Sequence, residues 1–110
     1  MEIKKVVEGA TLTVELTGKL DAVNSINLDT ELENSVIGMK ILIFDLAKLD
    51  YIASAGLRVL LKYQKKAARN DCKMKIKNVK GEVREIFYTT GFSDFLNIVD
   101  DSVKRLSIEF

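Results

Sequence analysis

Residues 41–61 read ILIFDLAKLDYIASAGLRVLL and contain the two features that decide the fold. The run from Ile41 to Phe44 is apolar at every position, which is typical of a strand covered on both faces. A helix is expected over residues 54–69, because apolar residues recur there at helical spacing while lysines and arginines fill the opposite face. Its expected buried stripe consists of Leu57, Leu60, Leu61, Gln64, Ala67 and Ala68. Residues 48–53 are expected to form a short connection. The stretch therefore predicts a strand followed by a helix, the first two elements of a parallel βαβ unit.

Further strands are expected on both sides of this unit. Alternating apolar and polar residues predict strands at residues 3–7 and 12–16, joined as a hairpin, with the second strand ending at residues 17–19. Lysines alternate with apolar residues over residues 73–77, and a last short strand is expected at residues 97–99. The order of elements predicts an α/β fold, a mixed sheet of four to five strands with helices packed against it.

Three more helical segments fit between and after the strands. A helix is expected over residues 21–38, with Asp21 as its N-cap and Gly38 ending it. Its expected apolar positions are Ala22, Val23 and Ile26, continued at steps of four by Leu28, Leu32 and Val36. A second helix is expected over residues 82–90, and a last helical turn over residues 101–106. Since no linker or repeat divides the chain, residues 1–110 are expected to form one domain.

Composition excludes several classes of function. The chain is 47% hydrophobic and 30% charged, the balance of a globular protein, and its net charge is only +1. Histidine is absent, so the usual general base and the commonest metal ligand are missing. With one cysteine as well, neither a Ser-His-Asp triad nor a zinc site is expected. We therefore expect a protein that is not an enzyme and that uses no cofactor and no metal.

The chain carries the features of a cytoplasmic protein. Cys72 is its one cysteine and cannot form an internal disulfide, which suits a reducing compartment. The first residues lack the apolar run of a signal peptide, and the longest apolar stretch is too short to span a bilayer. No aromatic residues interleave with the lysines of residues 73–77 to stack bases. We expect no membrane insertion and no nucleic-acid partner.

Polar side chains are expected to gather at one edge of the sheet. In open α/β sheets the binding surface lies beyond the carboxyl ends of the parallel strands. Asp21 follows the second expected strand, Asp45 ends the central strand, and Ser54 begins the next helix. A hydroxyl at a helix start lies beside free N–H groups and the positive end of the helix dipole, which suits a phosphate, bound or covalently attached. On pattern alone, capping and turn roles account for the same three residues.

Two segments resemble the motifs of STAS domains, closest to the bacterial anti-sigma factor antagonists. They are residues 18–22, GKLDA, and residues 45–61, DLAKLDYIASAGLRVLL. The resemblance covers essentially the whole chain and implies a STAS domain over residues 1–110. It implies that Ser54 is phosphorylated by a partner that is both anti-sigma factor and ATP-dependent serine kinase. It further implies that the unphosphorylated protein binds this partner and frees the sigma factor, and that a phosphatase restores the unphosphorylated form.

The resemblance also implies where the partner binds, and it shows two departures. The expected contact residues are Asp21, Asp45, Tyr51, Ile52, Ala53, Ala55, Gly56, Leu57 and Arg58. Antagonists typically carry Asp before the acceptor serine, where this chain has Ala53, and Gly where it has Arg58. These departures favour an alternative, a non-phosphorylated STAS subunit of a lipid-transport ATPase or sensory complex. A third hypothesis, an enzyme with a serine nucleophile, lacks a base to support it.

Overall fold

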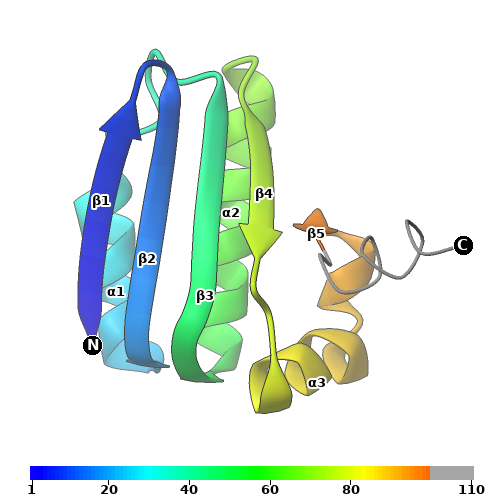
Figure 1. The fold of residues 1–110 in the computed structure, drawn as a ribbon. Helices are drawn as coiled ribbons and strands as arrows, with labels where there is room; N and C mark the ends of the chain where they lie inside the picture. Colours follow the sequence, from blue (N-terminus) through cyan, green and yellow to red (C-terminus); the bar gives the residue numbers. More distant parts are fainter. Residues whose placement is uncertain (100–110) are drawn as a thin grey trace, which may run out of the picture.

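The computed structural model describes residues 1–99, in which one five-stranded sheet is backed by helices (Figure 1). The elements in chain order are β1 (Glu2–Glu8), β2 (Thr11–Leu20), α1 (Ala22–Leu32), β3 (Ile41–Ile52), α2 (Ser54–Arg69), β4 (Lys73–Lys77), α3 (Gly81–Thr90), the 3-10 turn η1 (Phe92–Asp94) and β5 (Ile98–Val99). The strands lie in sequence order; β1 is antiparallel to β2, and all later neighbours are parallel. The predicted mixed α/β sheet is confirmed, with five strands.

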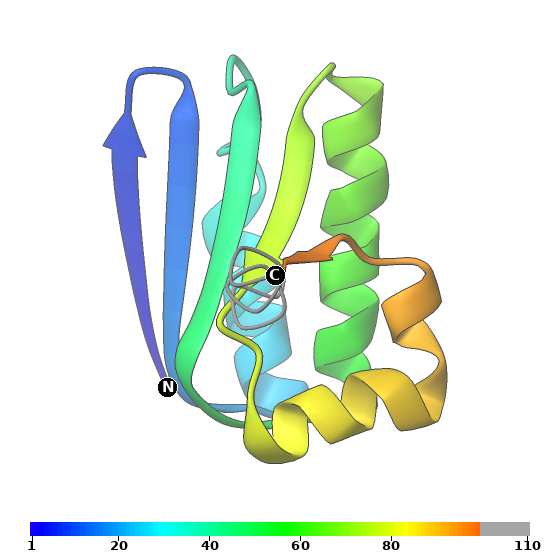
Figure 2. The same cartoon turned by 45° about the vertical axis from the view of Figure 1, so that its right-hand side comes forward.

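The helices stand at the back and at the lower end of the sheet. Both α1 and α2 lie behind it in the view of Figure 1, and Figure 2 shows α3 running below the ends of β3 and β4. Side chains on successive strand residues point to opposite faces, so every second residue meets the helices. The buried residues of the two central strands include Leu12, Val14, Leu16, Leu42, Phe44 and Leu46. They form the core together with the inner faces of α1 and α2.

The central strand β3 is apolar on both faces, yet within residues 1–99 helices cover only one of them (Figure 1). Ile41 and Ile43 lie on the other face and are half-buried. They are flanked by the threonines of β2 and the lysines of β4. The prediction of two covered faces was therefore wrong for the described residues. Neighbouring strands bury much of a branched side chain without a second layer.

Several boundaries differ from those predicted. β2 continues to Leu20 and β3 to Ile52, because register shifts in their pairing, with Gly18 at φ +103°, let both strands run past the polar residues. α1 ends at Leu32 instead of Gly38, and residues 33–38 form turns. Val36 is nevertheless buried, as are Leu28 and Leu32, so these positions were predicted correctly although the helix length was wrong. The helical turn predicted at residues 101–106 lies outside the described residues.

The helix α2 has the predicted bounds but a different inner face. Its buried residues are Gly56, Leu57, Leu60, Tyr63 and Ala67. Of the predicted stripe, Leu61 and Gln64 are half-buried and Ala68 is exposed. Tyr63 was not expected in the core, yet its side chain is fully buried. Burial of this tyrosine is possible because its hydroxyl group forms hydrogen bonds with Asp29 of α1.

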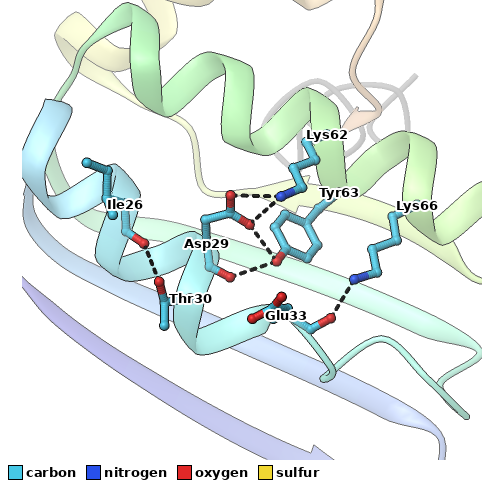
Figure 3. Close-up of polar contacts among 7 residues, drawn as sticks. All are labelled: Ile26, Asp29, Thr30, Glu33, Lys62, Tyr63 and Lys66. Carbon is cyan, nitrogen blue, oxygen red and sulfur yellow. Dashed lines mark hydrogen bonds and ion pairs between the residues drawn. The ribbon is translucent and has the colours of Figure 1, made fainter.

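A polar cluster joins α2 to α1 (Figure 3). The Tyr63 hydroxyl lies 2.8 Å from Asp29 Oδ1 and 2.9 Å from the Asp29 carbonyl oxygen, and Lys62 Nζ contacts the same carboxylate at 2.8 Å. Lys66 Nζ donates to the carbonyl of Glu33 one turn further along. The hydrogen bond from Lys62 lowers the pKa of Asp29, and burial raises the pKa of Tyr63. These contacts fix the two helices beside each other, with both N-termini at the same edge of the sheet.

Candidate functional site

The carboxyl ends of β2 and β3 lie side by side, and each leads directly into a helix. Leu20 faces Ile52 in the parallel ladder, and the Ala53 N–H donates to the Leu20 carbonyl at 2.9 Å. The residue after β2 is Asp21, the N-cap of α1, and the residue after β3 is Ala53, the N-cap of α2. The structure therefore places two helix starts next to each other at one edge of the sheet.

Asp21 is the N-cap of α1, as its pattern predicted. Its Oδ1 accepts a hydrogen bond from the Asn24 backbone N–H at 2.9 Å, which satisfies one of the free donors of the helix start. The Asn24 side chain donates back to the Lys19 carbonyl, and the buried Ser25 hydroxyl donates to the Asp21 carbonyl. Asp21 is exposed, but its carboxylate already has a structural role.

Ser54 is the first helical residue of α2, one position after the N-cap. The cap is Ala53, which has an extended backbone and a methyl group that accepts no hydrogen bond. Pattern alone favoured Ser54 as the cap, so that expectation was wrong by one residue. Ser54 is exposed, and no hydrogen bond between described residues involves its hydroxyl. The start of α2 thus presents a free hydroxyl beside backbone N–H groups that no side chain caps.

Asp45 does not belong to this edge. It lies inside β3, about 23 Å before the end of the strand at about 3.3 Å per residue. Its Oδ1 accepts from the Ala47 backbone N–H at 3.1 Å and from Asn78 Nδ2 at 2.9 Å. The carboxylate therefore ties β3 to the segment after β4. The prediction that Asp45 meets Asp21 and Ser54 was wrong, because β3 continues well beyond its apolar run.

The other predicted contact residues divide by exposure. Tyr51 and Arg58 are exposed, and Ala53 and Ala55 are half-buried. Ile52 and Leu57 are each 1% exposed and belong to the core, so the expectation that they form an apolar contact surface is wrong. Their apolar side chains lie in the core, where they stabilise the packing of the start of α2 against the sheet.

Gly56 is buried and allows α2 to approach the strand ends. A Cβ atom at this position would lie 2.8 Å from Leu20 Cγ and 2.9 Å from Ile52 Cγ1, closer than side-chain carbons pack. The helix start therefore rests directly on the ends of β2 and β3. Gly56 was predicted as a contact residue, but its position gives it a spacing role beneath Ser54.

Two apolar residues of α1, expected among the apolar positions of the helix, are exposed and were not predicted as contact residues. Val23 and Ile26 are each 68% exposed. Both lie in the first half of α1, the helix whose Asp29 is paired with Lys62 of α2. The signal was available in the sequence, because both residues are out of phase with the buried positions of α1.

Metal-ligand groups and membrane-spanning helices were sought in the described part of the chain. Within residues 1–99, no three Cys, Asp or Glu side chains come together in a group that could hold a metal ion. No helix among these residues is long and apolar enough to cross a membrane.

Comparison with known proteins agrees with the fold and the family expected from the sequence. The model of the STAS domain family matches residues 2–105. BtrV of Bordetella bronchiseptica, which carries the name of an anti-sigma factor antagonist, is 37% identical over 78 residues, 70% of this chain and 67% of BtrV.

Two solved structures show the same fold at low sequence identity. An anti-sigma factor antagonist from Mycobacterium paratuberculosis is 18% identical with a TM-score of 0.77, covering 94% of this chain and 92% of its own. The anti-sigma factor antagonist SpoIIAA, solved in an unphosphorylated form, is 15% identical with a TM-score of 0.72, covering 96% and 98%. SpoIIAA of Bacillus has also been solved in a phosphorylated form. Because the family model spans nearly its whole length, this chain belongs to the STAS domain family.

Proposed function

We propose that this protein is an anti-sigma factor antagonist that phosphorylation of Ser54 switches off. It binds a kinase-type anti-sigma factor and thereby releases the sigma factor. The observation that carries the proposal is the exposed Ser54 hydroxyl, free at the uncapped start of α2. The resemblance to the antagonist motif assigns the acceptor role to the same serine. The names of BtrV and SpoIIAA support this function over the lipid-transport and sensory-complex alternative. Residues 1–110 then act as one cytoplasmic STAS domain that binds and does not catalyse.

The chemistry of the switch is supplied by the partner. The kinase holds ATP with Mg²⁺, and Ser54 Oγ forms a bond to the γ-phosphorus as the bond to the β,γ-bridging oxygen breaks. ADP leaves, and the hydroxyl proton passes to a base of the kinase. This arrangement suits a chain without histidine. A phosphatase later hydrolyses the phosphate ester with water and restores the hydroxyl.

The proposed contact surface consists of the exposed and half-buried residues around the two helix starts. Its members are Asp21, Val23, Ile26, Tyr51, Ala53, Ser54, Ala55 and Arg58. The exposed apolar pair on α1 provides side chains that a partner can bury, which is where binding energy concentrates. The buried residues Ile52, Gly56 and Leu57 support this surface from below.

The off state follows from charge. A phosphate adds roughly −1.5 to −2 charges at neutral pH in the middle of this surface. At a helix start this charge meets free N–H groups, so the fold of the antagonist tolerates it. A partner that presents its own nucleotide phosphates there would be repelled.

Phosphate mapping tests the assignment. The kinase is captured from source-cell extract on the immobilised chain in the presence of nucleotide, then incubated with the chain and Mg-ATP, and peptides are sequenced by mass spectrometry. We expect phosphate on Ser54 alone, none in Ser54→Ala, and full phosphorylation in the control Ser93→Ala. Phosphate on Ser25, Ser35, Ser93, Ser102 or Ser107 would overturn the assignment.

A further inference from the structure

A row of cations runs along the exposed face of α2, starting one turn after Ser54. Its members are Arg58, Lys62, Lys65 and Arg69, which recur at steps of three and four residues and therefore share one face of the helix. Together with Leu61 they line one shallow hollow on the surface. Lys62 is already paired with Asp29, whereas Arg58 has no ion pair among the described residues.

We propose that Arg58 holds the phosphate of phosphorylated Ser54 within the same helix, so that the chain stabilises its own off state. This inference rests on the proposed function, because that function puts the phosphate on Ser54. It also gives a role to Arg58, one of the two positions at which this chain departs from the antagonist motif.

The geometry of a helix brings the two side chains together. Residues four apart have Cβ atoms about 5–6 Å from each other, and side chains lean toward the helix N-terminus, which tilts Arg58 back toward Ser54. An anion placed N-terminal to a cation is also the more favourable order at this spacing. The planar guanidinium can donate two parallel hydrogen bonds to phosphate oxygens. Both residues are exposed, so the contact requires no movement of the backbone.

The charged groups around Arg58 leave it free for this role. On α2 its neighbour is Lys62, which is held by Asp29 of α1. At the neighbouring start of α1, Asp21 Oδ1 accepts a hydrogen bond from the Asn24 N–H. A carboxylate carries one negative charge, whereas a phosphoserine carries roughly 1.5 to 2 at neutral pH. The phosphate is therefore the stronger partner for the guanidinium.

A titration of the phosphate tests the contact without any kinase. Phosphoserine is installed at position 54 during translation, and its second pKa, ordinarily about 6, is measured by phosphorus NMR. A nearby cation favours the doubly charged form and lowers this pKa. We expect Arg58→Gln to raise it by about 0.3 relative to the parent chain. The matched control Arg69→Gln removes the same charge from the far end of the same helix and should leave the value unchanged.

The outcomes separate this proposal from the previous one. Equal phosphate pKa values in the parent and Arg58→Gln overturn the contact, and so does an equal rise in Arg69→Gln, which would indicate a general charge effect. Circular dichroism of each variant checks that the fold is retained. A kinase that ignores Ser54 would contradict the proposed function, but the titration would still give a definite answer about Arg58.

Discussion

The starts of α1 and α2 lie beside each other at one edge of the sheet and are built differently. At α1 the carboxylate of Asp21 caps the helix through the Asn24 N–H at 2.9 Å. At α2 the cap position is Ala53, which accepts nothing, and the Ser54 hydroxyl is free among the described residues. A cap stabilises a helix by about 1 kcal/mol. One start is thus closed for stability, and the other leaves its donors and a nucleophile open to a partner.

An open helix start still needs a fixed position. Below Ser54, the buried Gly56 lets α2 rest on Leu20 and Ile52, and further along the helix Tyr63 and Lys62 bind Asp29 of α1. The hydroxyl and N–H groups at the start of α2 are therefore free to bind a partner, while packing holds the helix itself in a fixed position. A kinase that must align a hydroxyl with a γ-phosphate benefits from this combination.

The largest expected effect is at the contact beneath Ser54. Gly56→Ala adds a Cβ at 2.8–2.9 Å from Leu20 and Ile52 carbons, so we expect the free energy of unfolding to fall by about 1–3 kcal/mol. Helix propensity alone predicts the opposite sign, a gain of about 1 kcal/mol. Urea denaturation distinguishes the two, and a stabilised variant would show that α2 does not rest tightly on the strand ends.

A smaller loss is expected from the cluster that holds the helices together. Asp29→Asn removes the carboxylate that accepts from Tyr63 and Lys62, and we expect a loss of about 1–2 kcal/mol at pH 7. The pKa of Asp29 is lowered in the folded state, so its contribution is present above the unfolded-state pKa and disappears as the pH falls through the folded-state pKa. The gap between parent and Asp29→Asn should therefore begin to close as the pH falls below about 4, the unfolded-state pKa of an aspartate, and should vanish once the carboxyl is protonated in the folded state. A gap that persists at the acid end would count against this ion pair.

Exchanging the caps tests the comparison of the two helix starts directly. Asp21→Ala should cost about 1 kcal/mol, whereas Ala53→Asp should gain about 0.5–1 kcal/mol by capping α2. The same Ala53→Asp change should alter the rate of Ser54 phosphorylation several-fold, because the new carboxylate competes for the free donors beside the hydroxyl. Paired thermal melts and initial phosphorylation rates decide the matter. If Ala53→Asp changes neither quantity, the start of α2 is not the open site described above.

The smallest stability effect is expected at Ser54 itself. Ser54→Asp places a negative charge at the positive end of α2, which should raise the free energy of unfolding by about 0.3–1 kcal/mol. Ser54→Asn is the matched uncharged control and should show no such gain. A loss of stability in Ser54→Asp alone would indicate that the helix start does not tolerate charge, as a phosphorylated state requires.

Local pattern in the sequence was sufficient for some parts of the molecule. The bounds of α2 and the capping role of Asp21 could be predicted, because both depend on neighbouring residues. The position of Asp45 could not, since irregular pairing with β2 carries β3 through polar residues that look like a loop. Tyr63 was missed because its partner Asp29 lies 34 residues away in the chain. The cap was misplaced by one residue because alanine is an uncommon N-cap.

The central claim is that a phosphate on Ser54 separates the antagonist from its kinase partner. The most direct measurement is a calorimetric titration of the captured kinase, loaded with nucleotide, with the unphosphorylated chain and with the chain carrying phosphoserine at position 54. We expect the phosphorylated chain to bind at least tenfold more weakly, a loss of about 1.4 kcal/mol or more in binding free energy. Equal affinity of the two forms would contradict it.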